Sequence, residues 1–516
     1  PELVSDPRFA GAPHGIPLEH RPALRKIISD IVSTKTRAEW LRIFQENDAP
    51  CAPVMTREEF INDPQVIHNG MRVEVNDDEL GKTVQMGVPV KLSRTPGAIR
   101  RSAPLLGQHT KEVMNELKVP IKHHTTPTQP FPQAVLSGVR VVDFAQWHAG
   151  GQIGWLLAEM GAEVVKVETF DGDPCRIVAY AFMCVNRGKR SISVDLRSKQ
   201  GQEVVHRLIK DADIVLENFR PGVAKRINMD YDTLQHINPE IIYCSVTGYG
   251  SSGPYSKLPG YDPLIQARSG VMKAQGGRQG NPIFLWAPIF DFGCALIAAY
   301  GSLAALYHRQ RTGEGQQVEA SILSTGLAFQ SGNFIYYDGK GPEADGGTDL
   351  IGLSALCRLY QARDSWLMLS IQESEQWKLF VSTFNQHELT SRYSAKEAMS
   401  SPVDSDLALT LEKIFLTRPV NEWLKLLQSH VYCAPVLSYR DIYHNAQVME
   451  NELLTIEDHP DWGRVWVAQN CAKFSDITSG VTRGTPRLGE HTEEILKELG
   501  FDTIQIKELR EQTIVL

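Results

Sequence analysis

The chain has 516 residues, with 53 Lys and Arg against 61 Asp and Glu, and its formal net charge is -8. A hydrophobic content of 42% and a charged content of 22% are typical of a folded globular protein and exclude intrinsic disorder, collagen and coiled coil. The length predicts more than one domain, and the absence of a basic stripe argues against a nucleic-acid partner.

The first 120 residues repeat a part of the C-terminal sequence. Repeated motifs in a constant order indicate duplicated structural units. We therefore interpret residues 1–120 as the C-terminal portion of a first unit without an obvious catalytic constellation, whose N-terminal portion would lie upstream of Pro1. The motif pairs are Glu39-Trp-Leu41 with Glu422-Trp-Leu424, Cys51-Ala-Pro-Val54 with Cys433-Ala-Pro-Val436, and Leu106-Gly-Gln-His-Thr110 with Leu488-Gly-Glu-His-Thr492.

A linker and a complete unit follow. Residues 121–136 are rich in Pro and Thr, which favours an extended linker, and the unit occupies residues 137–516. It opens with a strand at residues 137–144, a helix at residues 153–160 and a strand at residues 163–168, the βαβ pattern of a parallel sheet in an α/β fold. The alternation continues with helices at residues 202–210 and 231–237 and strands at residues 213–217 and 241–245.

Glycines at the first strand-to-helix turn leave two interpretations open. A dinucleotide site requires the pattern G-x-G-x-x-G, whereas this stretch reads Ala149-Gly-Gly-Gln-Ile-Gly154, so that the first glycine is missing or displaced. The alternative is that the glycines permit the helix to pack closely on the strand. We favour close packing.

Six motifs follow one another along the complete unit, and in this order they resemble the class III CoA-transferase family. That family also includes carnitine and formyl-CoA transferases and the α-methylacyl-CoA racemases. The repeated C-terminal motifs resemble the family's C-terminal part, so the resemblance covers almost the whole chain. The six motifs are Gly161-Ala-Glu-Val-Val-Lys-Val-Glu168, Asn186-Arg-Gly-Lys-Arg-Ser191, Glu217-Asn-Phe-Arg-Pro-Gly222, Gly248-Tyr-Gly-Ser-Ser-Gly-Pro254, Gly260-Tyr-Asp262 and Arg311-Thr-Gly-Glu-Gly-Gln316.

The resemblance implies a Rossmann-like large domain plus a smaller α/β domain. We expect the large domain at residues 137–330 together with a returning C-terminal segment, and the small domain within about residues 340–460. Subunits of this family are rings that interlock in pairs. The resemblance therefore implies an interlocked homodimer, or an intramolecular pseudo-dimer between the complete unit and the first repeat.

The family's nucleophilic aspartate falls on Asp291, ahead of an apolar helix. An ionised carboxylate there would attack the thioester of an acyl-CoA and carry coenzyme A to a small carboxylic acid through an aspartyl anhydride and an aspartyl-CoA thioester, in a site that excludes water. Coenzyme A is thus implied as an acyl-CoA co-substrate. Without the family motifs, an acid at this position would be interpreted as a helix cap.

The residues implied in CoA binding surround the predicted strand ends. Arginine suits the phosphates of CoA because it donates charge-assisted, bidentate hydrogen bonds. One departure is Thr169 with Phe170, where many relatives have arginine. This departure predicts that part of the usual contact with the nucleotide is weaker or is supplied by other residues. The implied residues are His148, Ala149, Asp195, Leu196, Arg197, Asn218, Phe219, Arg220, Arg226 and Tyr261.

Three alternative functions remain open at this stage. A racemase of the family would place His where Tyr261 stands, and a phenol with a pKa near 10 is a poor base. The partial tandem repeat resembles the CoA-transferase/lyase that converts dimethylsulfoniopropionate to dimethyl sulfide. Trp147 and Trp286 would suit its sulfonium group by cation–π attraction, or simply pack. The third alternative is an inactive CoA-binding assembly subunit.

The remaining expectations concern mobile elements, metals and location. Gly346 and Gly347 are candidates for a lid over the intermediate, although polar loops are often only linkers. The eight cysteines are scattered, without a CxxC pair or a cluster with His, which predicts reduced thiols and no metal site. The most apolar segment, residues 294–306, has the length of a buried helix. We expect a cytoplasmic protein without a membrane or nucleic-acid partner.

Overall fold

The computed structural model describes residues 2–12, 15–118, 134–277, 280–341, 351–383, 387–459, 462–469, 472–475 and 483–516. Most of the linker predicted at residues 121–136 therefore lies outside the described residues. The same holds for the predicted lid glycines, Gly346 and Gly347.

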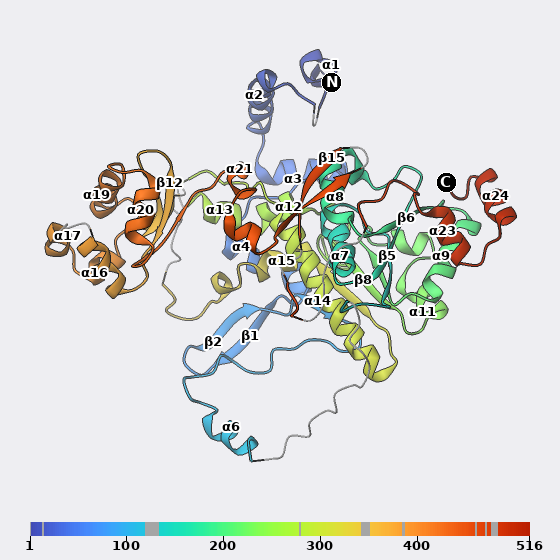
Figure 1. Ribbon diagram of the computed structural model, residues 1–516, viewed down its shortest axis with the longest axis horizontal. Coiled ribbons are helices and arrows are strands. Elements are labelled where there is room, and N and C mark those ends of the chain that lie inside the picture. The colour runs from blue at the N-terminus through green and yellow to red at the C-terminus, as the bar shows by residue number, and fades with distance from the viewer. Residues whose placement is uncertain are drawn as a thin grey trace.

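A seven-stranded sheet, counted over the described residues, forms the centre of the large domain (Figure 1). Its strand order is β3-β9-β8-β7-β4-β5-β6, and all neighbouring strands are parallel except β3, which is antiparallel to β9. The predicted α/β, Rossmann-like fold class is thus confirmed. The strands are β3 (Val90–Leu92), β4 (Arg140–Asp143), β5 (Glu163–Glu168), β6 (Arg190–Ser193), β7 (Ile214–Glu217), β8 (Ile242–Thr247) and β9 (Gln317–Ser321).

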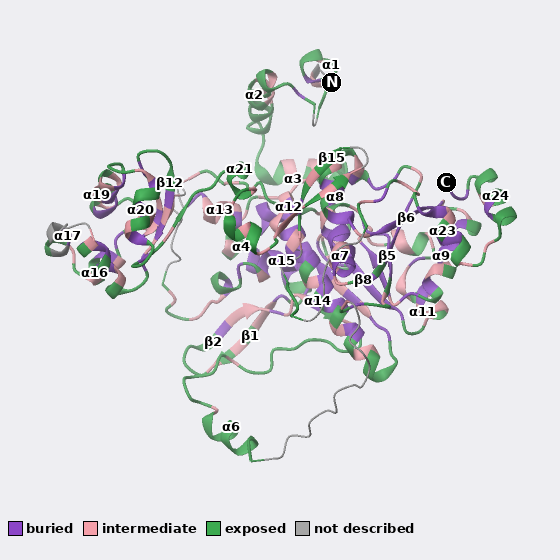
Figure 2. Cartoon of the chain, in the orientation of Figure 1, coloured by how far each residue is buried: buried purple, intermediate pink, exposed green. Residues whose placement is uncertain are grey.

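Successive residues of the strands face opposite helical layers, because side chains alternate along a strand. Val141 of β4 belongs to the core cluster under α7 (Trp147–Glu159) and α14 (Ile289–Thr312). Val142 belongs to the cluster on the other face. Both faces are covered, which explains why β4, β5, β6, β7 and β8 are buried along almost their whole length (Figure 2). The second face is covered by α9 (Lys199–Lys210), α11 (Tyr231–Ile237), α23 (Thr492–Glu498) and α24 (Thr503–Glu511).

The smaller domain has its own antiparallel sheet and its own aromatic core. Tyr360, Phe415 and Trp423 are buried in this core, with Phe415 in ring contact with both of the others. After this domain the chain returns to the large domain and ends on α23 and α24. The elements are β10 (Gly352–Ser354), β11 (Cys357–Gln361), β12 (Trp366–Ser370), β13 (Tyr432–Pro435), α16 (Ser374–Thr383), α17 (His387–Arg392), α18 (Ala395–Met399), α19 (Asp406–Phe415) and α20 (Val420–Leu427).

The N-terminal sequence contributes directly to the large domain. Its strand β3 extends the central sheet beside β9. Phe60, Val66 and Met71 belong to the same core cluster as α7 and α14. We call residues 56–86 the first arm; it comprises α4 (Arg57–Ile61), α5 (Pro64–His68), β1 (Arg72–Asp77) and β2 (Gly81–Met86).

Residues 438–468, which we call the second arm, have the same order of elements as the first arm. Both arms begin with a capping box, at Thr56 and at Ser438, and both end in an antiparallel hairpin with six paired residues per strand. The preceding helices also match, since the indole of Trp40 donates to Val32 O and that of Trp423 to Phe415 O, each at 2.7 Å. The second arm comprises α21 (Tyr439–Ile442), α22 (Ala446–Glu450), β14 (Leu454–His459) and β15 (Gly463–Ala468).

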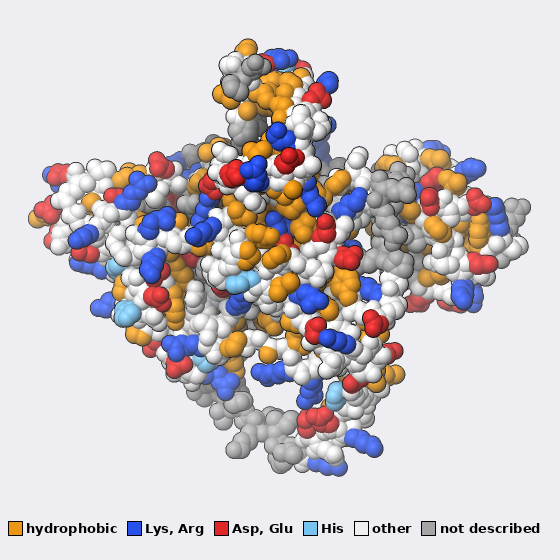
Figure 3. Space-filling view, turned by 180° about the vertical axis from the view of Figure 1, so that it is seen from behind, with side chains coloured by type: hydrophobic (Ala, Val, Ile, Leu, Met, Phe, Trp, Pro, Cys, Tyr) orange, Lys and Arg blue, Asp and Glu red, His pale blue; other side chains and the backbone are white. Residues whose placement is uncertain are grey.

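The two arms differ in burial although their elements match. Phe60 in the first arm is 0% exposed, whereas Ile442, at the matching position of the second arm, is 38% exposed. A similar contrast separates α2 (Arg21–Val32), which buries no residue, from α19, which buries one apolar face. In Figure 3, hydrophobic side chains gather on the N-terminal projection that carries α2. A groove of about 780 Å³ there is lined in part by Ile16, Leu24, Ile28, Val32 and Trp286.

Helix α14 contains the most apolar segment of the sequence. Its 24 residues are long and apolar enough to cross a membrane by length and composition, yet 61% of its most apolar window is buried inside the protein. Phe290, Ala295 and Ala298 on this helix lie in the core cluster beneath the sheet. The helix therefore serves as a central support, and its first turn is held by the protein core.

Candidate active site

The candidate site lies where the strand order reverses. From β4 the chain proceeds to β5 on one side, and it later enters β7 on the other side of β4. In α/β sheets, ligands bind in the crevice at the carboxyl ends of such strands. The loop after β4 is joined to the loop after β7 by two hydrogen bonds. Asn218 Oδ1 accepts from Gln146 N at 2.8 Å, and Asn218 Nδ2 donates to Gln146 O at 2.7 Å.

Trp147, the first residue of α7, has an unusual backbone. Its φ is 56°, in the left-handed region, and such a conformation costs a non-glycine residue on the order of 1–3 kcal/mol. The Trp147 N–H donates to Asp173 Oδ1 at 3.3 Å, while its side chain is 44% exposed. Strained residues of this kind occur preferentially at functional sites.

The glycines of α7 allow the helix to pack closely against β4 and the loop after β7. A Cβ at Gly150 would lie 2.8 Å from the Asn218 side chain, and one at Gly154 would lie 2.6 Å from Asp143 Oδ2. These distances are shorter than a normal carbon contact, so only glycine fits. The geometry supports the close-packing interpretation over a dinucleotide fingerprint.

His148 brings the first turn of α7 against the first turn of α14. Its ring contacts Phe292 edge-on, with 5.6 Å between ring centroids. Burial lowers the pKa of His148, and the carboxylates of Asp173 and Asp262 oppose that shift. The imidazole is therefore favoured in its neutral form at pH 7.

Asp262 caps the start of α14. Its Oδ2 accepts from Phe290 N at 2.7 Å and from Asp291 N at 3.2 Å, and its Oδ1 accepts from the Gln266 side chain. Two N–H groups that have no partner within the helix are thereby satisfied. Asp262 itself begins α12 (Asp262–Arg268). The capping role that an isolated sequence would assign to Asp291 thus belongs to Asp262.

Asp291 lies in the first turn of α14 and is only 9% exposed. Its Oδ1 is buried without a hydrogen-bond partner. Burial, and to a lesser extent the nearby Asp262 carboxylate, raise the pKa of Asp291 to about 8, against the opposing effect of a hydrogen bond with the Asp262 backbone. Asp291 is thus a poorly solvated carboxyl group whose conjugate base would be strongly nucleophilic, which suits attack on an activated carbonyl.

The first arm braces the elements that carry this carboxyl group. Arg268, at the end of α12, forms a buried ion pair with Asp63 of the first arm at 2.6 Å. Asn69 Nδ2 donates to Tyr249 O at 2.7 Å, in the loop that follows β8. The first arm therefore contacts both the loop after β8 and α12, although neither Asp262 nor Asp291 belongs to it.

The other residues implied in CoA binding lie at or near the same edge of the sheet. Asp195, Leu196 and Arg197 follow β6, with Leu196 buried in the core and Arg197 exposed. Phe219 packs on the second core cluster, and Arg220 forms an exposed ion pair with Asp48 at 2.9 Å. The remaining three are buried Ala149 in α7, exposed Arg226 at the end of α10 (Val223–Arg226), and Tyr261, the 45% exposed residue before α12.

Some residues lie outside this arrangement, and others were not singled out from the sequence. Trp286 is 89% exposed and lines the groove beside α2, whereas Trp147 lies at the start of α7.

The sequence alone assigned no role to Asp173 or Lys166. The Gly-Asp-Pro triplet at residues 172–174, typical of a capped helix start, was the available signal for Asp173. Over the described part of the chain, no group of three or more His, Cys, Asp or Glu is placed to hold a metal ion.

Comparison with known protein families gives a match along most of the chain. The model of CoA-transferase family III matches residues 1–110 and 136–492. A formyl-CoA:oxalate CoA-transferase of Bradyrhizobium sp. (strain ORS 278) is 31% identical over 410 residues, which cover 73% of this chain and 96% of the relative. The succinyl-CoA:glutarate CoA-transferase of Mus musculus is 30% identical over 387 residues, or 72% of this chain and 88% of the relative.

Solved structures give a consistent result. A Brucella suis protein of the CAIB/BAIF family matches with a TM-score of 0.62 at 28% identity, covering 71% of this chain and all of that structure (100%). A Mycobacterium tuberculosis protein solved in an orthorhombic crystal form matches with the same TM-score at 27% identity and the same coverage. Each match spans a whole relative but leaves part of this chain uncovered.

Proposed function

Because the chain belongs to CoA-transferase family III, we propose that it transfers coenzyme A from an acyl-CoA to a carboxylic acid through covalent intermediates on Asp291. The chain is an acyl-CoA:carboxylate CoA-transferase by family membership. Our proposal concerns the nucleophile, the binding residues and the assembly. The observation that carries it is the buried Asp291 carboxyl group, whose Oδ1 has no hydrogen-bond partner while Asp262 caps the helix.

The proposed reaction proceeds in two paired exchanges. An Asp291 oxygen bonds to the thioester carbon, the C–S bond breaks, and the CoA thiolate leaves, which gives a mixed anhydride. The thiolate then attacks the aspartyl carbonyl and displaces the first acid as a carboxylate, leaving an aspartyl-CoA thioester. The acceptor carboxylate attacks that thioester, and the released thiolate takes the acceptor acyl group from the second anhydride. Asp291 is regenerated without a net change in protons or electrons.

We propose that CoA lies along the carboxyl ends of β4, β6 and β7. His148 and Ala149 lie in the first turn of α7, whose N-terminal N–H groups favour a negative charge or a developing oxyanion. Asn218, Phe219 and Arg220 follow β7 at the neighbouring strand end. The exposed Arg220 is placed to exchange its Asp48 partner for a phosphate, because that ion pair is solvent-exposed and therefore weak.

Intact-mass measurement tests the covalent step. We expect that incubation with succinyl-CoA or formyl-CoA alone yields a protein heavier by one CoA less water, and that peptide mapping places this mass on Asp291. Addition of glutarate or oxalate should discharge the adduct and give the new acyl-CoA. Turnover without an adduct, or an adduct on another residue, would contradict the proposed nucleophile.

The pH dependence of transfer provides a separate check. Only the ionised carboxylate attacks, and the pKa of Asp291 is raised to about 8. We therefore expect kcat/KM to increase about tenfold per pH unit below pH 8 and to level off above it. Asp262→Asn keeps an oxygen acceptor for the helix start but removes the charge that adds to the effect of burial on this pKa, so the inflection should move to lower pH. An unchanged inflection in Asp262→Asn would contradict this electrostatic account.

The same assay separates the alternative activities. Tyr261 stands at the cap of α12 where a racemase would require a histidine, which disfavours α-proton exchange. Incorporation of deuterium from solvent without transfer would identify a racemase. Dimethyl sulfide released from dimethylsulfoniopropionate and acetyl-CoA would identify the lyase. Binding of CoA without either reaction or any transfer would identify an inactive assembly subunit.

We further propose that the first arm replaces a partner subunit's arm, so that the chain is an intramolecular pseudo-dimer at this contact. Three observations support this assembly. The arms share their elements and hairpin pairing, the first arm is buried on the large domain, and the second arm leaves its matching apolar positions more exposed. The second arm would be covered in the same way by another large domain, as in an interlocked homodimer.

A further inference from the structure

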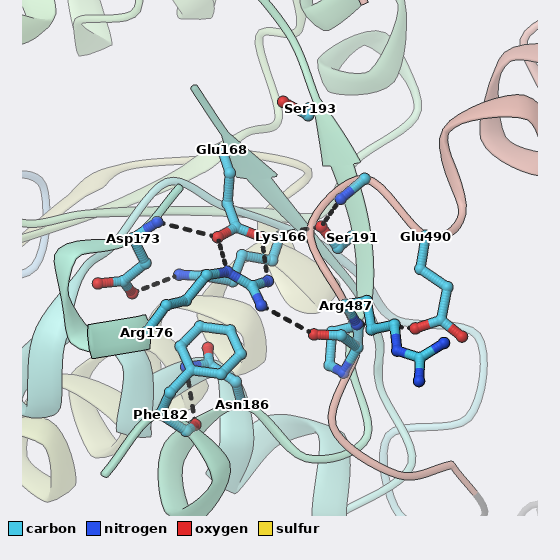
Figure 4. A network of polar contacts seen from close by, with 12 residues as sticks. Lys166, Glu168, Asp173, Arg176, Phe182, Asn186, Ser191, Ser193, Arg487 and Glu490 are labelled. Atoms are coloured by element: carbon cyan, nitrogen blue, oxygen red, sulfur yellow. Dashed lines mark hydrogen bonds and ion pairs between the residues drawn. The ribbon is translucent and has the colours of Figure 1, made fainter. Parts of the chain in front are cut away.

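A buried network adjoins the loop that begins α7, and Figure 4 shows its centre. Lys166 on β5 forms an ion pair with Asp173 at 2.9 Å, and both side chains are almost completely buried. Burial alone would lower the pKa of Lys166, but the carboxylates of Asp173, Asp143 and Glu168 raise it above its usual value. A charged lysine is thus held inside the domain, and such pairs require a strong geometric match.

Both members of this pair also bind the backbone of the loop. Lys166 Nζ donates to Ala145 O at 2.7 Å, and Asp173 Oδ1 accepts from Trp147 N at 3.3 Å and from Cys175 N at 2.9 Å. Asp143 Oδ1 accepts from Ala145 N at 2.9 Å. Together with the two bonds between Asn218 and Gln146, these contacts fix every backbone N–H and C=O from Ala145 N to Trp147 N.

The rest of the network keeps Asp173 in place. Asp173 N donates to Glu168 Oε1 at 3.0 Å, and Glu168 forms a two-pronged pair with Arg176 at 2.8 and 2.7 Å. Ser191 Oγ donates to Glu168 Oε2 at 2.8 Å and accepts from Gly489 N of the returning C-terminal segment. The loop is therefore tied to the repeated motif at residues 488–492.

We propose that the Lys166–Asp173 ion pair is a positioning device, which holds Trp147 in its left-handed conformation and so sets the first turn of α7 opposite Asp291. The inference rests on the proposed function for its catalytic consequence. Asp173 and Lys166 do not touch the reacting atoms in this scheme. They act through Trp147 and His148, whose ring lies against Phe292, the neighbour of Asp291.

A double-mutant cycle tests this role. Asp173→Asn removes the charge that balances Lys166, and we expect kcat to fall at least about tenfold with KM for acyl-CoA changing less than about threefold. Glycine adopts a left-handed φ without strain. In the Trp147→Gly background, the same Asp173→Asn change should therefore reduce kcat by less than about threefold. Equal losses in both backgrounds would overturn the proposal.

Hydrogen exchange provides a readout that does not depend on the reaction. We expect Asp173→Asn to accelerate amide exchange in peptides that cover residues 144–150, whether or not Asp291 is the nucleophile. Unchanged exchange in these peptides would overturn the inference. The absence of a CoA adduct on Asp291 in the wild-type protein would overturn only the proposed function. If Asp173→Asn does not fold, Asp173→Glu supplies the same test, because it keeps the charge and displaces the acceptor by one methylene.

A second buried ion pair provides the matched control. Arg187 and Glu159 are 3% and 1% exposed, and Glu159 lies at the opposite end of α7 from Trp147. Glu159→Gln should lower the thermal midpoint, as Asp173→Asn should, because it removes the nearer carboxylate partner of a buried cation and leaves Arg187 only the Glu457 carboxylate at 3.4 Å. It should change neither kcat nor the exchange of residues 144–150. An equal loss of kcat in Glu159→Gln would reduce the role of Asp173 to general stability.

Discussion

Asp291→Asn is expected to abolish CoA transfer, with kcat lower by at least about a thousandfold. The amide has almost the shape of the carboxyl group but cannot form the anhydride, so only substrate binding and orientation remain. Initial rates with succinyl-CoA and glutarate would measure the loss, and the CoA adduct should be absent from the intact mass. Cys294→Ser, one helical turn further along α14, is the control that should retain transfer.

The same variant should be more stable than the wild-type protein, and increasingly so at alkaline pH. The folded-state pKa of Asp291 is about 8, above its ordinary value of 3.8, so the native state holds a proton that the unfolded chain releases between these values. The stability that this proton contributes is lost as pH rises through about 8. Thermal midpoints at pH 6 and pH 9 would show the difference, and an Asp291→Asn midpoint that falls as steeply as wild type would contradict the assigned burial.

Phe60→Ala is expected to destabilise the large domain by about 3–5 kcal/mol, the usual range for removing a fully buried phenylalanine. The side chain is 0% exposed and lies in the core cluster with α7 and α14, against Phe334 at 5.8 Å between ring centroids. Loss of this contact should also lower transfer activity, because the first arm braces α12 through Arg268 and Asp63. Urea unfolding would measure the change in the free energy of unfolding.

Ile442→Ala is the matched variant, since it removes an apolar side chain at the corresponding position of the second arm. At 38% exposure, its loss should cost less than about 1 kcal/mol. The contrast with Phe60→Ala therefore measures the asymmetry between the arms. Comparable destabilisation by both variants would show that the second arm is also seated, and it would contradict the proposed pseudo-dimer arrangement in the single chain.

The order of elements in the complete unit could be predicted from local patterns. The helix predicted at residues 231–237 is α11 with the same bounds, and the strand predicted at residues 163–168 is β5. Helix α7 begins at Trp147, six residues before the prediction, because Gly150 and Gly151 made its first turns resemble a loop. Those glycines permit close packing, and intrinsic helix propensity carries no information about such tertiary contacts.

The environment of Asp291 required the tertiary structure. Family motifs made Asp291 a candidate nucleophile, whereas its position at a helix start indicated a cap. The assignment of capping to Asp262 depends on two backbone N–H groups that lie 28 and 29 positions further along the chain. The role of Asp173 likewise depends on its hydrogen bond with Trp147 N, which lies 26 positions earlier in the chain, in the loop after β4.

The two arms show most directly what the sequence determines and what the tertiary structure determines. The sequence by itself determined the matching capped helices and hairpins of the two arms, because caps, turns and alternation act over a few residues. It also determined the parallel sheet and the family. Only the tertiary structure decided that Phe60 is buried and Ile442 is exposed, since burial depends on which surface a segment meets, and similar local patterns meet different surfaces here.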